Sequence, residues 1–217
     1  MLTPLRTLTN SLVFSGRNEE VGGESREYTS IFLNNTALLY KGIDVSLNGG
    51  VTSSTETDGT KMDSTMVTLG ANIVPHRTAT VTLYLTDSRT DQTGPGRESL
   101  SIDYRRLDLT VAYNPFRTLY IVGSLQLIEE SGQGMKTFQS YGLNWSPFPD
   151  GALQFRFSYN ETRRPEDQLT DRILTPGLRY KINNRSFLDL SYQWTRSESA
   201  SQTIDSSAFT SNLKIFL

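Results

Sequence analysis

The chain repeats a strict two-residue alternation of apolar and polar side chains, and this pattern constrains its fold more than any other feature. In "GALQFRFSYNE", residues 151–161, the polar residues Gln, Arg, Ser and Asn alternate with Leu153, Phe155, Phe157 and Tyr159. Successive side chains of a β-strand point to opposite faces of the sheet. This segment is therefore predicted to be a strand with one apolar and one polar face.

The same alternation recurs along the chain, and no comparable helical period accompanies it. Its apolar positions include Ile43, Val45 and Leu47; Val67, Leu69, Ala71 and Ile73; Ala79, Val81, Leu83 and Leu85; Leu119, Ile121, Leu125 and Leu127; Leu174, Leu178, Tyr180 and Ile182; and Leu188, Leu190, Tyr192 and Trp194. The pattern predicts an all-β protein.

Composition excludes several classes of protein. The net charge is −2, with both signs spread along the 217 residues, which argues against a nucleic-acid partner. No apolar run approaches the roughly 18 residues of a transmembrane helix. The chain has no cysteine, which removes disulfides and thiolate metal sites, and we expect neither a metal nor a cofactor. The N-terminal "MLTPLRTLTN" lacks the basic and apolar regions of a signal peptide, so we expect a signal peptide to be absent from this chain.

Turn chemistry divides the chain at two kinds of connection. Tight-turn signals stand at "YKG" (40–42), "PHRT" (75–78), "NPFRT" (114–118), "PFPDG" (147–151) and "NNRS" (183–186). Longer polar segments lie between them, at 17–26, 53–62, 87–98, 129–136, 161–171 and 196–207. About twelve strands fit between these connections, the first two over 5–16 and 27–39, with both termini on the tight-turn side.

The expected width of the sheet decides what its apolar face meets. Twelve strands close into a barrel too wide for alternating Leu and Val to fill, because about eight strands is the limit for an interior packed with side chains. Aromatic residues also gather in two bands, as they do at the two interfaces of a membrane barrel. One band is Tyr40, Tyr113, Phe116, Tyr120, Trp145, Phe148, Phe155, Tyr180 and Phe187, and the other includes Phe32, Phe138, Tyr159, Tyr192 and Trp194. The apolar face is predicted to face lipid. A soluble β-sandwich or β-helix is the alternative, and a need for detergent in extraction distinguishes the two.

These strands and connections resemble the bacterial outer-membrane β-barrel superfamily, of the porin-like kind, over nearly the whole chain. The C-terminal "FTSNLKIFL" has Phe209, Leu213, Ile215 and Leu217 on one face. It resembles the terminal strand that such barrels offer to the barrel-assembly machinery, although the last residue is Leu217 and not an aromatic.

The resemblance implies a transmembrane antiparallel up-and-down β-barrel, integral to the outer membrane of a Gram-negative bacterium. Residues 1–217 would form one domain, with short periplasmic turns, longer extracellular loops and both termini in the periplasm. The sequence leaves open that this domain is the C-terminal part of a longer protein. An oligomer or a larger complex is compatible with this architecture.

Two functions fit such a barrel: a channel for passive passage of small hydrophilic solutes, and a non-conducting anchor or scaffold, or the membrane domain of a larger exported protein complex. Strand phases predict a pore lining of Asp44, Asp108, Arg156, Arg179, Lys181, Asp189 and Lys214. These are four cationic and three anionic side chains, so a channel would show a mild anion preference.

In "DYRRLDL" the alternation changes phase at Arg105 and Arg106, as a β-bulge would cause. This position is expected at the outer rim, where the two guanidinium groups could contact lipopolysaccharide phosphates. An alternative is a strand that has already left the bilayer.

Catalysis is not expected. The one histidine, His76, lies in the tight turn "PHRT", away from the outer loops. Loop carboxylates such as Glu161, Glu166 and Asp167 are interpreted as solvated charges, with binding of divalent cations as the alternative.

Overall fold

The computed structural model describes residues 2–5, 7–21, 24–96 and 98–215. This described part forms thirteen β-strands and no helix. Twelve long strands are present, as predicted, each of 12–17 residues, and a short strand of four residues precedes them. No helix within the described ranges is long and apolar enough to cross a membrane. The strands are β1 (Leu2–Leu5), β2 (Leu8–Val21), β3 (Glu24–Tyr40), β4 (Ile43–Thr55), β5 (Lys61–His76), β6 (Ala79–Thr93), β7 (Leu100–Phe116), β8 (Leu119–Glu130), β9 (Gly134–Trp145), β10 (Leu153–Arg164), β11 (Leu169–Asn183), β12 (Ser186–Glu198) and β13 (Thr203–Ile215).

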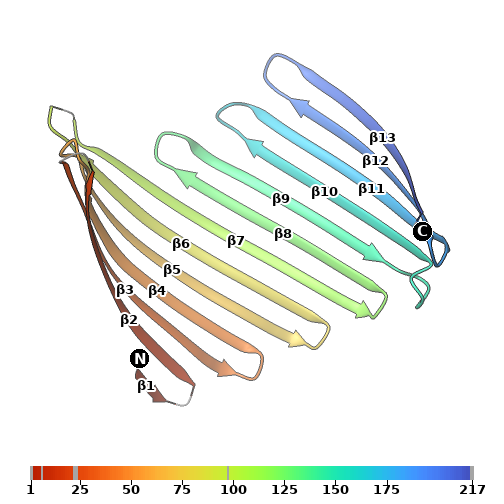
Figure 1. Ribbon diagram of the computed structural model, residues 1–217, viewed down its shortest axis with the longest axis horizontal. Coiled ribbons are helices and arrows are strands. Elements are labelled where there is room, and N and C mark those ends of the chain that lie inside the picture. Colours follow the sequence, from red (N-terminus) through yellow and green to blue (C-terminus); the bar gives the residue numbers. More distant parts are fainter. Residues whose placement is uncertain (1, 6, 22–23, 97, 216–217) are drawn as a thin grey trace. The chain divides into compact units, whose positions relative to one another are not determined.

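Strand order follows chain order from β1 to β13 (Figure 1). Consecutive strands pair antiparallel, as the registers of β1 to β5 and of β9 to β13 show. This is the up-and-down topology that the alternating turn signals predict.

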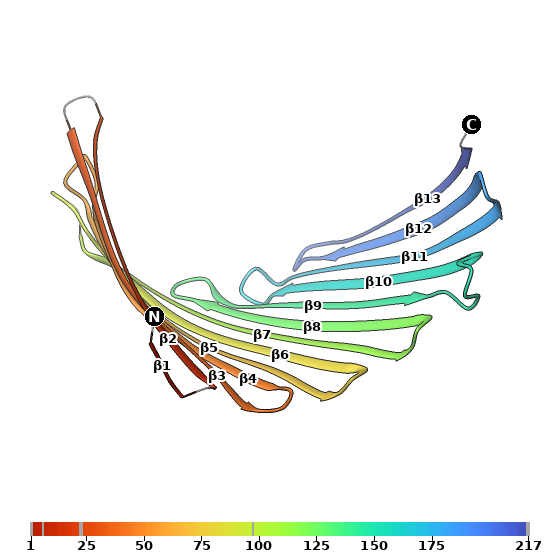
Figure 2. The same cartoon turned by 60° about the horizontal axis from the view of Figure 1, so that its bottom comes forward.

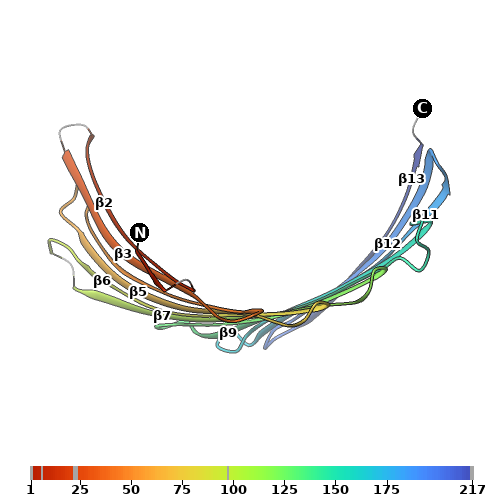
Figure 3. The ribbon, with the colours of Figure 1, turned by 90° about the horizontal axis from the view of Figure 1, so that it is seen from below.

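The described residues fall into two compact units, which we describe separately. The first lies within Met1–Ile73, Thr82–Leu107 and Ile128–Gln133, and the second within Val74–Val81, Asp108–Leu127 and Gly134–Leu217. In the first unit, β2 to β5 form a single layer of strands (Figure 3). In the second unit, β9 to β13 likewise form one layer (Figure 2).

Cross-strand register gives the layer of the first unit one apolar and one polar face. Leu47 lies opposite Leu69, and Val45 lies between Ala37 and Ala71. The alternate rows are polar: they include Asn34, Asn48 and Thr68 in one row and Thr36 and Ser46 in another. Hydroxyl contacts between Thr68 and Thr86, 3.1 Å, and between Thr90 and Ser64, 3.1 Å, continue this polar face onto β6.

The second unit has the same division into two faces. Its apolar face carries rows such as Trp145, Phe155, Leu178 and Leu190, and Tyr141, Tyr159, Leu174 and Trp194. The rings of Trp145 and Phe155 stack with their centroids 5.3 Å apart. Its polar face carries Gln154, Arg179, Asp189 and Asn212 in one row.

The described residues leave the apolar face of each unit accessible. Among the described residues no hydrophobic side chain is buried, and Phe14 and Phe209 are 68% and 67% exposed. A soluble domain buries such side chains in a core, whereas a membrane barrel leaves them for lipid. On β11 the apolar row runs from Leu174 to Ile182, about 26 Å at 3.3 Å per residue. That length is close to the roughly 25 Å height of the apolar band in outer-membrane barrels.

The prediction of long polar loops needs correction. The segment 161–171 is strand except for 165–168, and 196–207 is strand except for 199–202. Strand formation depends on the pairing partner more than on intrinsic propensity, and these polar segments pair with a neighbour, so the strands continue in register beyond the apolar rows. Among the loops that join consecutive strands from β8 to β13, the longest is 146–152, where the sequence predicted the tight turn "PFPDG". The other four predicted tight turns are short, at 41–42, 77–78, 117–118 and 184–185.

At least three aromatic residues assigned to the interface bands lie on the polar face instead. Phe32 lies opposite Gly50, Phe138 opposite Thr162, and Phe187 opposite both Lys181 and Lys214. The position of an aromatic residue near a strand end does not determine the face of the sheet on which its side chain lies. That face depends on the two-residue alternation of the strand. Phe216 and Leu217, at the end of the predicted terminal-strand signal, lie outside the described residues.

Candidate functional site

Four of the predicted pore-lining side chains converge on one hollow in the polar face of the second unit. Arg156, Arg179, Asp189 and Lys214 come from β10, β11, β12 and β13, and they line a cavity of about 530 Å³. The strand register explains this convergence. Arg179 lies opposite Asp189, and Arg156 lies opposite Gly177, which is the next residue of β11 on the same face as Arg179. Since Gly177 has no side chain, the space beside Arg156 stays open.

Asp189 is the centre of an ion-paired group in this hollow. Arg179 donates two hydrogen bonds to it, from Nε to Oδ1 at 2.6 Å and from Nη2 to Oδ2 at 3.1 Å. Lys214 Nζ lies 3.3 Å from Oδ2. The bidentate geometry is the strong form of an arginine–carboxylate pair. One carboxylate thus faces two cations and leaves one positive charge in excess.

Arg156 adds a second positive charge to the hollow. Its side chain makes one long hydrogen bond, 3.5 Å from Nη2 to Gln154 Oε1. The part of the chain that the structure describes contains no carboxylate in ion-pair contact with it. Three cations and one anion therefore line the hollow, and Arg156 is the charge that an incoming anion would meet with least competition.

The other predicted lining residues lie on polar strand phases but outside this hollow. Lys181 is on β11, opposite Phe187. Asp108 accepts a hydrogen bond from Gln126 Nε2 at 2.6 Å in the second unit. Asp44 lies opposite Asn72 in the first unit, where it borders a separate hollow. The sequence therefore predicted the face of these residues but not which of them meet.

Arg105 and Arg106 lie side by side in β7. Arg105 Nε donates to Asp87 Oδ2 at 3.0 Å, and its Nη1 lies 3.8 Å from Glu129 Oε2. All three side chains are about two-thirds exposed, so these pairs are weak. A contact of either arginine with lipopolysaccharide stays a prediction, as does the bulge between them.

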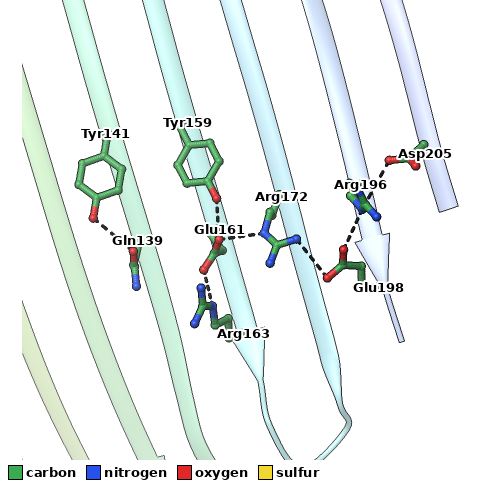
Figure 4. A network of polar contacts seen from close by, with 9 residues as sticks. All are labelled: Gln139, Tyr141, Tyr159, Glu161, Arg163, Arg172, Arg196, Glu198 and Asp205. Carbon is green, nitrogen blue, oxygen red and sulfur yellow. Dashed lines mark hydrogen bonds and ion pairs between the residues drawn. The ribbon is translucent and has the colours of Figure 1, made fainter. Parts of the chain in front are cut away.

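A network of charges on the apolar-face phase of the second unit was not predicted (Figure 4). Glu161 is only 5% exposed, which corrects its interpretation as a solvated loop carboxylate. It accepts hydrogen bonds from Tyr159 Oη at 2.5 Å, from Arg172 Nε at 3.0 Å and from Arg163 Nε. Three donors on one carboxylate compensate for its removal from water.

The network extends across β11, β12 and β13. Arg172 Nη1 lies 3.1 Å from Glu198 Oε2. Arg196 Nε lies 2.8 Å from Glu198 Oε1 and 3.8 Å from Asp205 Oδ1, as ion pairs without hydrogen-bond geometry. The two-residue alternation of β10 could have placed Glu161 on this face, because Glu161 follows Phe157 and Tyr159 at alternate positions of the strand.

The described ranges contain no cluster of side chains suited to hold a metal ion. No group of three or more His, Cys, Asp or Glu side chains there could hold a metal ion. His76 ends β5, and its Nδ1 lies 2.8 Å from Thr78 Oγ1 in the adjacent turn.

Comparison with known proteins identifies similar structures but does not identify a family. No protein-family model matches the sequence, and no curated protein matches it. The structure is similar to the siderophore receptor PirA from Acinetobacter baumannii, with a TM-score of 0.61 and 7% identity, over 99% of this chain and 47% of that one. Weaker likenesses are to the translocator domain of the autotransporter NalP from Neisseria meningitidis (TM-score 0.37, 12% identity, 97% and 88% coverage) and to an anion-selective porin from Comamonas acidovorans (TM-score 0.40, 11% identity, 96% and 100% coverage).

The likeness to the siderophore receptor shows the fold, which is that of outer-membrane β-barrel proteins. The chain spans about half the length of that receptor. The resemblance stated from the sequence is confirmed at this level, without a specific family.

Proposed function

We propose that the protein is an integral channel of the bacterial outer membrane that lets small hydrophilic solutes pass, with a mild preference for anions. The observation that carries the proposal is the pairing of an uncovered apolar face with a polar hollow that holds three cations and one anion. Lipid against the first face leaves the second face to line an aqueous interior. The proposal requires no catalytic step and no cofactor.

The excess charge of the hollow sets the expected selectivity. A partly hydrated guanidinium attracts chloride or a carboxylate and repels potassium, by an amount that falls as salt screens it. The screening length falls from about 10 Å at 0.1 M salt to about 3 Å at 1 M. An anion preference that arises at Arg156 should therefore weaken at high salt.

Planar-bilayer recording tests the proposal. The reversal potential in a potassium chloride gradient should indicate a modest anion preference for the unaltered protein. Arg156→Ala together with Arg179→Ala should reduce this preference. Each single variant of the pair is compared with Arg185→Ala, which removes one positive charge from the turn at 184–185, outside the hollow, and for which we expect a smaller change.

The second candidate is a non-conducting anchor or scaffold barrel. The ion pairs of Asp189 with Arg179 and Lys214 on the neighbouring strands favour it, because charges that neutralise one another are less able to attract a solute ion. Absence of conductance steps from correctly folded protein would contradict the channel and support the scaffold.

A further inference from the structure

The polar face of the first unit contains a second hollow with a different chemistry. It has a volume of about 380 Å³, which lies at the lower end of the range for small-molecule sites. Among the described residues, no lysine or arginine lines it. Its polar side chains include the hydroxyls of Thr36 and Ser46, the amide of Asn72 and the carboxylate of Asp44, and Thr7 and Thr9 also line it from the chain before β3. None of these groups carries a positive charge that would neutralise an anionic ligand.

An aromatic ring forms one wall of this hollow. Tyr84 is on the polar phase of β6, and it is 44% exposed. Its ring lies against the backbone of β5 at Gly70, where an added Cβ would be 2.7 Å from Cε1 and 3.0 Å from Cδ1. The Ser46 hydroxyl reaches the same position above Gly70. The glycine therefore lets the ring lie close to the sheet while much of it stays accessible from the hollow.

The polar groups around the ring retain capacity for a ligand. Across the described residues, no hydrogen bond or ion pair engages the Asp44 carboxylate, which is exposed beside the hollow. Asn72 lies opposite Asp44 and accepts one hydrogen bond at Oδ1 from Thr82 Oγ1, 3.3 Å away, so its amide hydrogens remain as donors. Carboxylate acceptors, amide donors and hydroxyls of both kinds match the alternating hydroxyl groups of a sugar.

We propose that this hollow binds a neutral sugar, of mono- or disaccharide size, with one apolar face of the sugar ring on Tyr84. The hydroxyl groups at the edge of the sugar would donate to Asp44 and exchange hydrogen bonds with Ser46 and Asn72. This inference depends on the proposed function in one respect: water and solutes must reach the polar face. It adds a solute class, since the hollow of the second unit suits anions.

A second aromatic–glycine contact provides a matched control. On the same polar face, the Phe32 ring covers Gly50 in the way that Tyr84 covers Gly70. Phe32 is less exposed, and it does not line the hollow. Its replacement by alanine removes a similar contact without removing the wall of the site.

Saturation-transfer NMR and titration calorimetry on detergent-solubilised protein test the proposal, with maltose, lactose and cellobiose as neutral probes and galacturonate as the acidic one. We expect at least one neutral disaccharide to bind more tightly than galacturonate. Tyr84→Ala should weaken this binding at least about tenfold, which corresponds to about 1.4 kcal/mol. Tyr84→Phe should largely preserve it because the ring remains, and Asp44→Asn should weaken it.

Phe32→Ala should leave sugar affinity close to that of the unaltered protein, and circular dichroism should confirm that every variant retains its strands. The proposal is overturned if no neutral disaccharide binds, if galacturonate binds better, or if folded Tyr84→Ala binds as well as the unaltered protein. Conductance without sugar binding would leave the channel proposal intact. Sugar binding without conductance would contradict the channel alone.

Discussion

Glu161 and Arg172 face each other across β10 and β11, with Arg172 Nε 3.0 Å from Glu161 Oε2. The pair lies one alternate row beyond Tyr159 and Leu174, at the point where the apolar side chains of this face end. A carboxylate that is 5% exposed and held by three donors stabilises the paired strands at this level. It also marks the boundary between residues suited to lipid and residues suited to a polar surface.

Glu161→Gln should destabilise the fold. The change removes the carboxylate charge to which Arg163, Arg172 and Tyr159 donate. A hydrogen bond to a charged group contributes about 1.5–3 kcal/mol to stability. Because Arg163 is 53% exposed, its pair contributes less, and we expect a total loss of roughly 2–3 kcal/mol. Urea unfolding in lipid vesicles, followed by tryptophan fluorescence, measures it. Glu166→Gln in the turn at 165–168 is the control, and an equal loss there would contradict the role of Glu161.

Asp189→Asn should increase the anion preference of the channel. The change removes the one carboxylate of the hollow while Arg156, Arg179 and Lys214 remain. Its effect is opposite in sign to that of Arg156→Ala, and both should diminish between 0.1 M and 1 M salt. Reversal potentials of the two variants under the same gradient give the comparison. Shifts in the same direction would rule out electrostatic selection at this hollow.

The two ends of the hairpins should lie on opposite sides of the membrane. Asp150 lies in the connection 146–152 and Asp167 in the turn at 165–168, at opposite ends of β10. In intact cells, an impermeant thiol reagent should label Asp167→Cys and spare Asp150→Cys. Both variants should react after the outer membrane is permeabilised. The reverse pattern in intact cells would invert the predicted topology.

Charge introduced on the apolar face should be costly. Leu83, Phe157 and Leu190 are predicted to lie near the bilayer centre, and Phe157 is 40% exposed on this face. Arginine at such a position should cost about 2–4 kcal/mol, measured by reversible unfolding into urea from lipid vesicles. Ser158→Arg, one residue away on the polar face, should cost less. Equal stability of Phe157→Arg and the unaltered protein would show that the two faces had been exchanged.

Alternation in the sequence was sufficient to predict the strands and the face of most side chains. Leu47 and Leu69 share a face because both follow the same two-residue phase, and no tertiary information is needed to see it. Phe32 shows the limit of reasoning from position: it was assigned to an aromatic band near the strand end, but its phase places it opposite Gly50 on the polar face.

The meeting of particular side chains could not be predicted from the sequence. The contact of Arg179 with Asp189 depends on the register of β11 and β12, which the short turn at 184–185 sets. The buried environment of Glu161 was missed because a segment with polar residues on both faces has no apolar alternation to identify it as strand. The extension of β10 to Arg164 became visible only through its pairing with β11.

The sequential order of the strands has a consequence for how the chain acquires its structure. Every observed register joins strands that are consecutive in the chain, and even a wide pairing such as Ile43 with Ile73 closes a loop of only thirty residues. Proteins dominated by such local pairings have a small entropic barrier to folding, since few distant segments must find one another. Each hairpin can therefore form on its neighbour in turn. The gain or loss of a hairpin at either end of the sheet would alter its size and leave the registers between the remaining consecutive strands unchanged.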